Sequence, residues 1–155
     1  MTPAINLLKK AKITHKVHQY EHDSAAESFG LEAAEKLSVD PAQVFKTLMV
    51  KLDDNSLCVA ILPVASMLSM KRLAKALNAK KAAMADKLEV ERVSGYVLGG
   101  VSPVGQKRRL KTVLDVSAEN FQTIFVSAGK RGLEIEISPQ QLMCLLSIVP
   151  AHICQ

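Results

Sequence analysis

The sequence has few aromatic residues and few cysteines, and both shortages narrow what the chain can be. Aromatic residues make up 4% of its 155 residues, and tryptophan is absent. A protein that reads single strands mainly by stacking bases on exposed rings is therefore not expected. The three cysteines, Cys58, Cys144 and Cys154, include no Cys-x-x-Cys pair. This spacing argues against a disulfide framework and a structural zinc site, and it favours a reducing cytosol.

Long apolar runs are also missing. The longest, residues 57–70, is interrupted by Pro63 and two serines, and it is shorter than the roughly 20 apolar residues that span a bilayer. The first ten residues are typical of a capped helix and not of a secretion signal. We therefore expect a soluble, cytoplasmic protein with no membrane partner.

The chain has enough hydrophobic residues for one core and a modest excess of positive charge. Hydrophobic residues make up 48% of the chain, and a chain of this length predicts a single domain over residues 1–155. Twenty Lys and Arg against fifteen Asp and Glu give a net charge of +5. This charge favours an acidic partner but does not by itself identify a nucleic acid.

Capping residues and hydrophobic periodicity predict short helices interspersed with strands. Helix or turn starts are predicted at Thr2-Pro3, Ser28, Asp40-Pro41, Ser69, Asp86 and Ser138-Pro139, with Glu89 completing a capping box at Asp86. Strands are predicted at residues 14–21, 44–52, 57–62, 80–85, 112–116, 123–127 and 133–137. Tight turns at 53–56 and 129–132 make two of the connections hairpins. The predicted fold class is mixed α/β (α+β), with a mixed sheet in place of an all-parallel one.

A glycine-rich loop followed by a run of cations is the most distinctive segment. Gly99, Gly100 and Gly105 allow a ligand to approach main-chain N–H groups, which can bind an anion or a polarised carbonyl oxygen. The cations that follow suit a phosphate-bearing partner; they are Lys107, Arg108, Arg109 and Lys111. A solvated turn next to a solvated basic face explains this segment equally well.

Lys46 is the second distinctive feature, because it interrupts an apolar strand. The alternation of a strand places it on the same face as Leu48 and Val50. A lysine on such a face indicates either a functional cation or an exposed sheet edge. Thr47 beside it is a weaker candidate, since threonine is common in strands.

Four separated segments, taken together, resemble the YbaK/EbsC family of freestanding aminoacyl-tRNA editing proteins, which includes cysteinyl-tRNA(Pro) deacylases. The segments are residues 1–10, Val44-Phe-Lys-Thr-Leu-Met-Val50, the loop from Ser94-Gly95-Tyr96, and Val126-Ser-Ala-Gly-Lys-Arg-Gly-Leu133. The resemblance implies a curved mixed sheet closing toward a barrel, surrounded by helices. It implies hydrolysis of mischarged tRNA, no cofactor, no metal and no DNA, and it suggests prolyl-tRNA synthetase as a partner.

The resemblance also assigns site residues. It implies that Lys46 steadies charge in the transition state, and that the loop at Gly99 and Gly100, with the N–H groups around Val101 and Ser102, binds the oxyanion. The remaining substrate-binding positions are Tyr20, Phe29, Thr47, Ser127, Gly129 and Glu134. Core packing explains Phe29 equally well, and a generic hairpin explains Ser127, Gly129 and Glu134 nearly as well. Two more cations, Lys130 and Arg131, join Lys107 to Lys111 as candidates for tRNA binding, and the clusters 71–75 and 80–81 could extend that surface.

Some points stay open. Ala128 stands where relatives usually have glycine, and Glu134 where a shorter acid is usual, which leaves the amino-acid preference open. No nucleophile-elbow motif is present, and His15, His18 and His22 lack the further ligands that a metal needs. An activated ester can instead be cleaved by positioning and by its own thiol. An alanyl-tRNA(Pro) deacylase and a noncatalytic tRNA-binding or synthetase-binding module remain alternatives.

Overall fold

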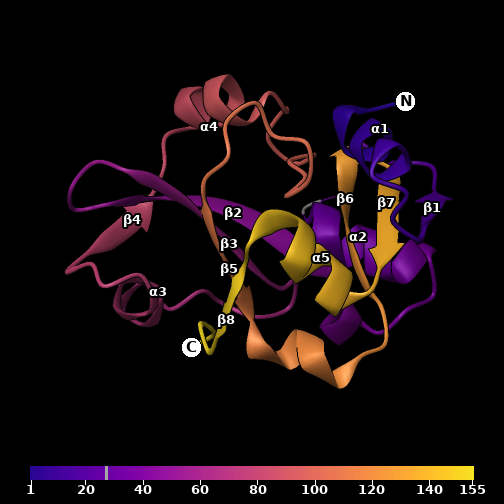
Figure 1. Ribbon diagram of the computed structural model, residues 1–155. Helices are drawn as coiled ribbons and strands as arrows, with labels where there is room; N and C mark the ends of the chain where they lie inside the picture. The colour runs from indigo at the N-terminus through magenta and orange to yellow at the C-terminus, as the bar shows by residue number, and fades with distance from the viewer. Residues whose placement is uncertain (27) are drawn as a thin grey trace.

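The computed structural model describes residues 1–26 and 28–155, whose strands form two sheets (Figure 1). The three-stranded sheet has the order β1 (His15–Gln19), β7 (Leu133–Ile137), β6 (Ile124–Lys130). The five-stranded sheet has the order β4 (Ala82–Met84), β2 (Phe45–Leu52), β3 (Leu57–Pro63), β5 (Lys111–Asp115), β8 (Val149–Ala151). The pairs β3–β5 and β5–β8 are parallel and the other pairs antiparallel, which confirms the mixed α/β class and both predicted hairpins.

The two sheets approach one another through a single isolated bridge, between Val44 and Phe125. Strand pairing among the described residues therefore gives two open sheets where one curved sheet was expected. The closure toward a barrel stays a prediction, since no closed ring of strands is found in this part of the chain.

Helices begin where the sequence predicted, and most are capped by the expected side chains. They are α1 (Pro3–Lys10), α2 (Phe29–Lys36), α3 (Met70–Ala76), α4 (Lys87–Ser94) and α5 (Pro139–Leu146), with 3-10 turns η1 (Pro41–Gln43) and η2 (Val116–Asn120). Thr2, Ser28, Ser69 and Ser138 each accept a hydrogen bond from the amide three residues later. These bonds satisfy amides that a helix start leaves without partners.

The capping box predicted at the start of α4 does not form. Asp86 occupies the N-cap position, but its side chain makes no capping hydrogen bond. Glu89 instead lies 2.9 Å from the Lys51 ammonium on β2. An ion pair to the sheet thus replaces the local bond, and it ties α4 to the strand beneath it.

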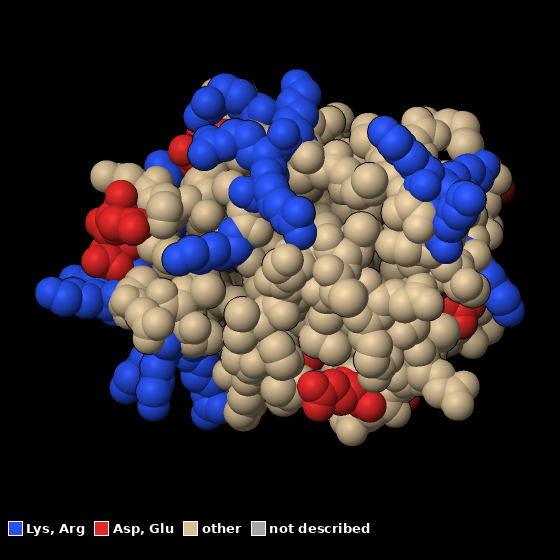
Figure 2. Space-filling model, viewed as in Figure 1, with Lys and Arg blue, Asp and Glu red and all other residues tan. Residues whose placement is uncertain are grey.

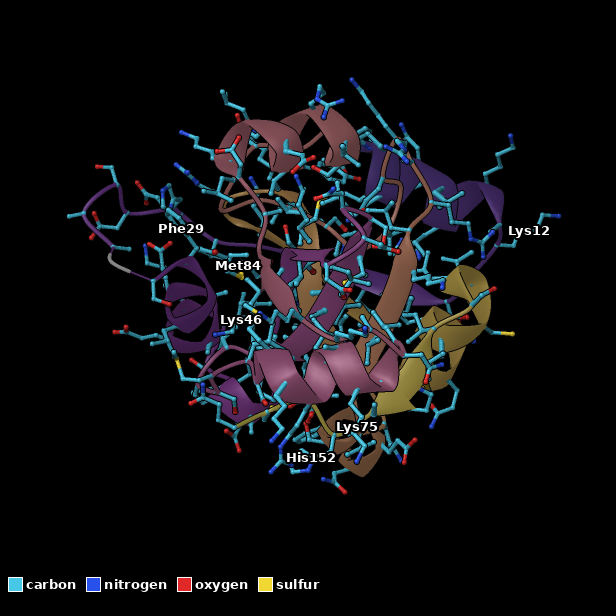
Figure 3. All side chains as sticks on the ribbon, turned by 90° about the vertical axis from the view of Figure 1, so that its left-hand side faces the viewer. Lys12, Phe29, Lys46, Lys75, Met84 and His152 are labelled. Atoms are coloured by element: carbon cyan, nitrogen blue, oxygen red, sulfur yellow. The ribbon has the colours of Figure 1, made fainter. Side chains whose placement is uncertain are left out.

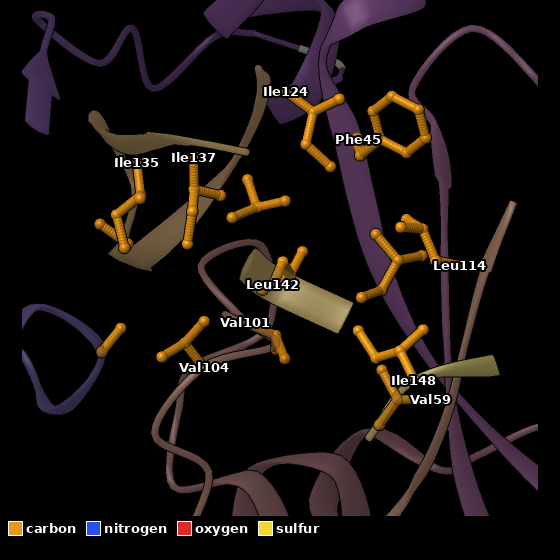
Figure 4. Packing of buried hydrophobic residues seen from close by; sticks show 14 of the residues in the cluster. Phe45, Val59, Val101, Val104, Leu114, Ile124, Ile135, Ile137, Leu142 and Ile148 are labelled. Atoms are coloured by element: carbon orange, nitrogen blue, oxygen red, sulfur yellow. The ribbon is translucent and has the colours of Figure 1, made fainter. Parts of the chain in front are cut away.

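The main core lies between the two sheets. Phe45 and Val59 from the larger sheet pack with Ile124 and Ile135 from the smaller one (Figure 4). A second cluster on the opposite face of β2 and β3 packs under α3 and includes Leu73, which is fully buried. Burial on both faces explains why β2 and β3 are nearly continuous apolar runs.

Strand β8 was missed from the sequence. It has three residues, includes Pro150, and pairs only along the outer side of β5. Proline is tolerated on such edge strands because no neighbour needs its N–H group. Among the described residues, no helix has the length and apolar character to cross a membrane.

Candidate active site

A cavity of about 360 Å³ opens between the edge of β2 and the β6–β7 hairpin. This volume lies within the usual range for small-ligand sites. Among the residues that line it, Phe29, Lys46 and Met84 come from three different elements, α2, β2 and β4 (Figure 3). The cavity wall also includes further predicted positions: Tyr20, Thr47, Gly99, Val101, Ser127, Lys130, Arg131 and Glu134.

The cavity exists because β4 is short. It pairs with β2 only at Val50–Leu52, and the last hydrogen bond on that side runs from the Ala85 amide to the Met49 carbonyl, at 3.1 Å. Residues 45–48 therefore have an edge without a β4 neighbour. Lys46 and Thr47 point to opposite faces of the strand, and both reach the cavity because it lies off this edge.

The Lys46 ammonium is half-buried beside the cavity. Its Nζ lies 3.5 Å from the Val64 carbonyl oxygen, which is its only hydrogen-bond partner among the described residues. Burial lowers the pKa of Lys46, and the nearby Cys154 offsets part of that effect. A cation with one long hydrogen bond retains donors for a ligand in the cavity.

Phe29, Gly99 and Arg131 close one side of the cavity. The Arg131 guanidinium lies over the Phe29 ring, 4.3 Å from its centre, and donates a 2.7 Å hydrogen bond to the Leu98 carbonyl. Gly99 has φ +92°, and a Cβ there would lie 2.6 Å from the Phe29 ring and 2.7 Å from Arg131 Nε. Glycine is therefore required for this contact by both backbone conformation and space.

The glycine loop makes a tight turn in which Gly100 is already engaged. The Gly100 amide donates to the Val97 carbonyl at 2.9 Å, and the positive φ of Gly99 before it is typical of a type II turn. Among the described residues, the amides of Gly99, Val101 and Ser102 have no acceptor. Of these residues, Gly99 and Val101 line the cavity, so their amides, and not that of Gly100, are the candidates for binding a ligand oxygen.

Two polar side chains in the cavity lack partners. Glu134 is 7% exposed, and its carboxyl group forms no ion pair with any described residue. Burial raises its pKa to about 8, so this carboxyl group is mostly protonated at neutral pH. The Thr47 hydroxyl is enclosed and also without a partner in this part of the chain. Buried polar groups of this kind are uncommon and call for an explanation.

Three predicted positions lie beside the cavity and not in its wall. Gly100 is buried against the backbone of Lys130 and Arg131. The Ser102 side chain is buried and accepts a hydrogen bond from the Val104 amide. Gly129 packs against the Tyr96 ring, where a Cβ would lie 2.5 Å from a ring carbon.

Ala128 belongs to the main hydrophobic core and does not line the cavity. Its difference from the residue usual in relatives therefore does not alter the cavity wall directly. The Ala128 carbonyl accepts a 2.5 Å hydrogen bond from the Thr2 hydroxyl, which ties the start of α1 to β6.

The predicted cations are divided between two places. Lys130 and Arg131 line the cavity, whereas Lys107, Arg108, Arg109 and Lys111 do not. Arg109 donates hydrogen bonds to the Leu145 carbonyl and the Ser147 hydroxyl, so it supports the end of α5. On the face shown in Figure 2, basic side chains form separate groups with neutral surface between them.

The histidines near the cavity pair with carboxylates. His18 contacts Glu136, and His22 Nδ1 lies 2.7 Å from Glu32. Burial tends to raise the pKa of Glu32, but hydrogen bonds from His22, the Asp23 amide and Lys36 outweigh it and lower the pKa to about 2. No group of three metal-ligating side chains occurs within residues 1–26 and 28–155.

Sequence reasoning missed the apolar half of the cavity wall. Leu48, Met49 and Val64 line it from β2 and the segment after β3, and Met84 and Leu98 lie at its rim. Met84 is 51% and Leu98 44% exposed. In the sequence these residues have the pattern of ordinary strand and loop positions. They line a cavity because β4 is short, and the sequence does not show that.

Comparison with known proteins identifies the family of the chain. The sequence profile of the aminoacyl-tRNA editing domain matches residues 24–145, so the chain belongs to that family. It is 35% identical over 147 residues, 93% of this chain and 87% of the relative, to a protein of Enterococcus faecalis (strain ATCC 700802 / V583) named "Putative Cys-tRNA(Pro)/Cys-tRNA(Cys) deacylase EbsC".

A second relative and a solved structure are also similar to this chain. The chain is 29% identical over 126 residues, 81% of this chain and 78% of the relative, to "Uncharacterized protein YwhH" of Bacillus subtilis (strain 168). The crystal structure of "a putative trans-editing enzyme for prolyl tRNA synthetase" superposes with a TM-score of 0.85 at 18% identity, over 100% of this chain and 98% of that one. At that identity the superposition shows a shared fold.

Proposed function

We propose that this chain is a trans-editing hydrolase that removes cysteine from mischarged tRNA(Pro). The observation that carries the proposal is one cavity that brings together the Lys46 ammonium, the amides of Gly99 and Val101, and two cations, Lys130 and Arg131. An ester linked to a phosphate-bearing strand needs these three kinds of group. The similarity to EbsC supports cysteine as the amino acid.

In the proposed reaction the protein positions the ester and stabilises charge. The substrate thiol attacks its own carbonyl carbon, so a carbon–sulfur bond forms and the carbon–oxygen bond to the ribose breaks. The thiol proton ends on the ribose hydroxyl, and water then hydrolyses the cyclic thioester to free cysteine. Lys46 and the loop amides stabilise the oxyanion that precedes bond breaking.

The substrates that separate the alternatives are cysteinyl-, seryl- and alanyl-tRNA(Pro). We expect the cysteinyl ester to be cleaved at least about 100-fold faster than the other two, because only it carries the internal nucleophile. Equal cleavage of cysteinyl and seryl esters would mean that water, and not the thiol, attacks. Cleavage of the alanyl ester alone would assign the sister specificity, and binding without cleavage would indicate a noncatalytic module.

A further inference from the structure

The buried carboxyl group of Glu134 is the one acidic group in the cavity wall of the described residues. It lies on β7 opposite Ser127 of β6, close enough to Tyr20 that its charge, after burial, helps raise the pKa of that phenol to about 12. Burying a carboxylate without a partner is strongly unfavourable. The Glu134 carboxyl group is therefore either protonated or paired with a cation from a bound ligand.

The cations of the same cavity do not supply that partner. The Lys46 ammonium donates its hydrogen bond to the Val64 carbonyl, and the Arg131 guanidinium contacts the Phe29 ring and the Leu98 carbonyl. Lys130 is exposed at the rim. No ion pair forms between Glu134 and any described residue, so a cation for it must come with a ligand.

Resting on the proposed function, we propose that Glu134 binds the α-ammonium group of the aminoacyl ester and thereby restricts the enzyme to substrates with a free amine. Every aminoacyl-tRNA carries this cation next to the reacting carbonyl. Peptidyl-tRNA and N-formylated or N-acetylated aminoacyl-tRNA carry a neutral amide there, which would leave the carboxyl group unpaired. The site would thus hydrolyse mischarged tRNA and spare chains under synthesis.

The proposal predicts a specific pH dependence. Glu134 has a pKa of about 8, and an α-amine has one of about 7.7–8.0. In the complex, the carboxylate and the ammonium group together hold one titratable proton. Below both pKa values the two free groups hold two such protons, so binding releases one and affinity rises with pH. Above both pKa values the free groups hold none, so binding takes one up and affinity falls as pH rises. Tyr20, Lys46, Lys130 and Arg131 face the same cavity. Burial raises the pKa of Tyr20 to about 12 and lowers the pKa of Lys46.

The test uses a stable ligand, 3′-amino-3′-deoxyadenosine joined to cysteine by an amide, with and without an N-acetyl group. We expect the protein to bind the free-amine form about 10- to 100-fold more tightly near pH 8. Below about pH 7, the ratio of the two affinities should decrease by up to about tenfold for each unit by which the pH is lowered. Glu134→Gln should remove the preference and leave binding of the acetylated form unchanged.

Glu136→Gln is the matched control, because Glu136 lies two residues away on β7 and bonds to His18 and Thr123 outside the cavity. It should keep the preference. Equal affinity of the wild-type protein for both ligands would overturn the proposal, and so would a preference that persists in Glu134→Gln, since that would indicate steric exclusion.

Hydrolysis of cysteinyl-tRNA(Pro), measured in parallel, separates this proposal from the proposed function. Turnover without amine preference would refute only the role of Glu134. Amine preference without turnover would refute only the deacylase assignment.

Discussion

Replacing Gly99 with alanine tests whether the contact between the glycine loop, Phe29 and Arg131 forms the working cavity. An alanine at φ +92° costs about 1–2 kcal/mol in backbone strain. Its Cβ would also lie 2.6 Å from the Phe29 ring, so the ring and the guanidinium must move apart. Loss of their cation–π contact adds about 0.5–1 kcal/mol. We expect a total loss of stability of about 1.5–3 kcal/mol, measured by urea unfolding.

The same displacement should also slow catalysis in the protein that remains folded. Phe29 and the Gly99 amide both line the cavity, and a shift of about 1 Å in a positioning group can reduce the rate by about 100-fold. We therefore expect kcat/KM for cysteinyl-tRNA(Pro) to fall by about that factor, under conditions where the variant is fully folded.

Gly95→Ala is the control for backbone strain. Gly95 has φ +83° at the end of α4, but a Cβ there would meet only the flexible Lys107 side chain, at 3.0 Å. It should lose about 1–2 kcal/mol and keep kcat/KM within about threefold, since it does not reach the cavity. If both variants lost activity equally, or if Gly99→Ala kept its activity, the role assigned to this contact would be wrong.

Three further substitutions test other parts of the structure. Leu73→Ala should lower stability by about 2–5 kcal/mol because this α3 side chain is fully buried against β2 and β3; kcat of the folded protein should not change. Glu32 has a pKa of about 2 against 4.5 when unperturbed, so its stabilising effect is present above pH 4.5 and is lost as pH falls toward 2. Glu32→Gln should therefore lower Tm at pH 7 and flatten the fall of Tm over that range. Arg109→Ala should cost about 1 kcal/mol of stability through its lost bonds to α5. Arg108→Ala should instead leave stability unchanged and reduce the salt dependence of tRNA binding by about one phosphate contact.

Local signals in the sequence were sufficient for most elements of the fold. Thr2, Ser28 and Ser69 cap helices as predicted, because a capping bond depends only on residues three positions apart. The seven predicted strands all occur, with small shifts at their ends. At Asp86 the local rule failed, since a tertiary ion pair from Lys51 engages Glu89.

The division into two sheets and the cavity between them depend on tertiary structure. The sequence showed that Lys46 interrupts an apolar strand, but not that β4 ends early enough to leave its edge open. It predicted tRNA binding for Lys107 to Lys111 and for Lys130-Arg131 alike, whereas of these cations only Lys130 and Arg131 line the cavity. Hydrophobic pattern specifies which face of a strand is buried, and it does not specify where the edges of two sheets meet.

The most direct test is single-turnover hydrolysis of cysteinyl-tRNA(Pro) by the wild-type protein and Lys46→Ala, with tRNA binding measured alongside. Lys10→Ala is the control, because Lys10 is an exposed cation of α1 outside the cavity. Loss of one charge-stabilising donor predicts a rate lower by about 100- to 1,000-fold in Lys46→Ala, with tRNA affinity nearly unchanged and Lys10→Ala as active as wild type. A Lys46→Ala variant that cleaves the ester at the wild-type rate would contradict the account.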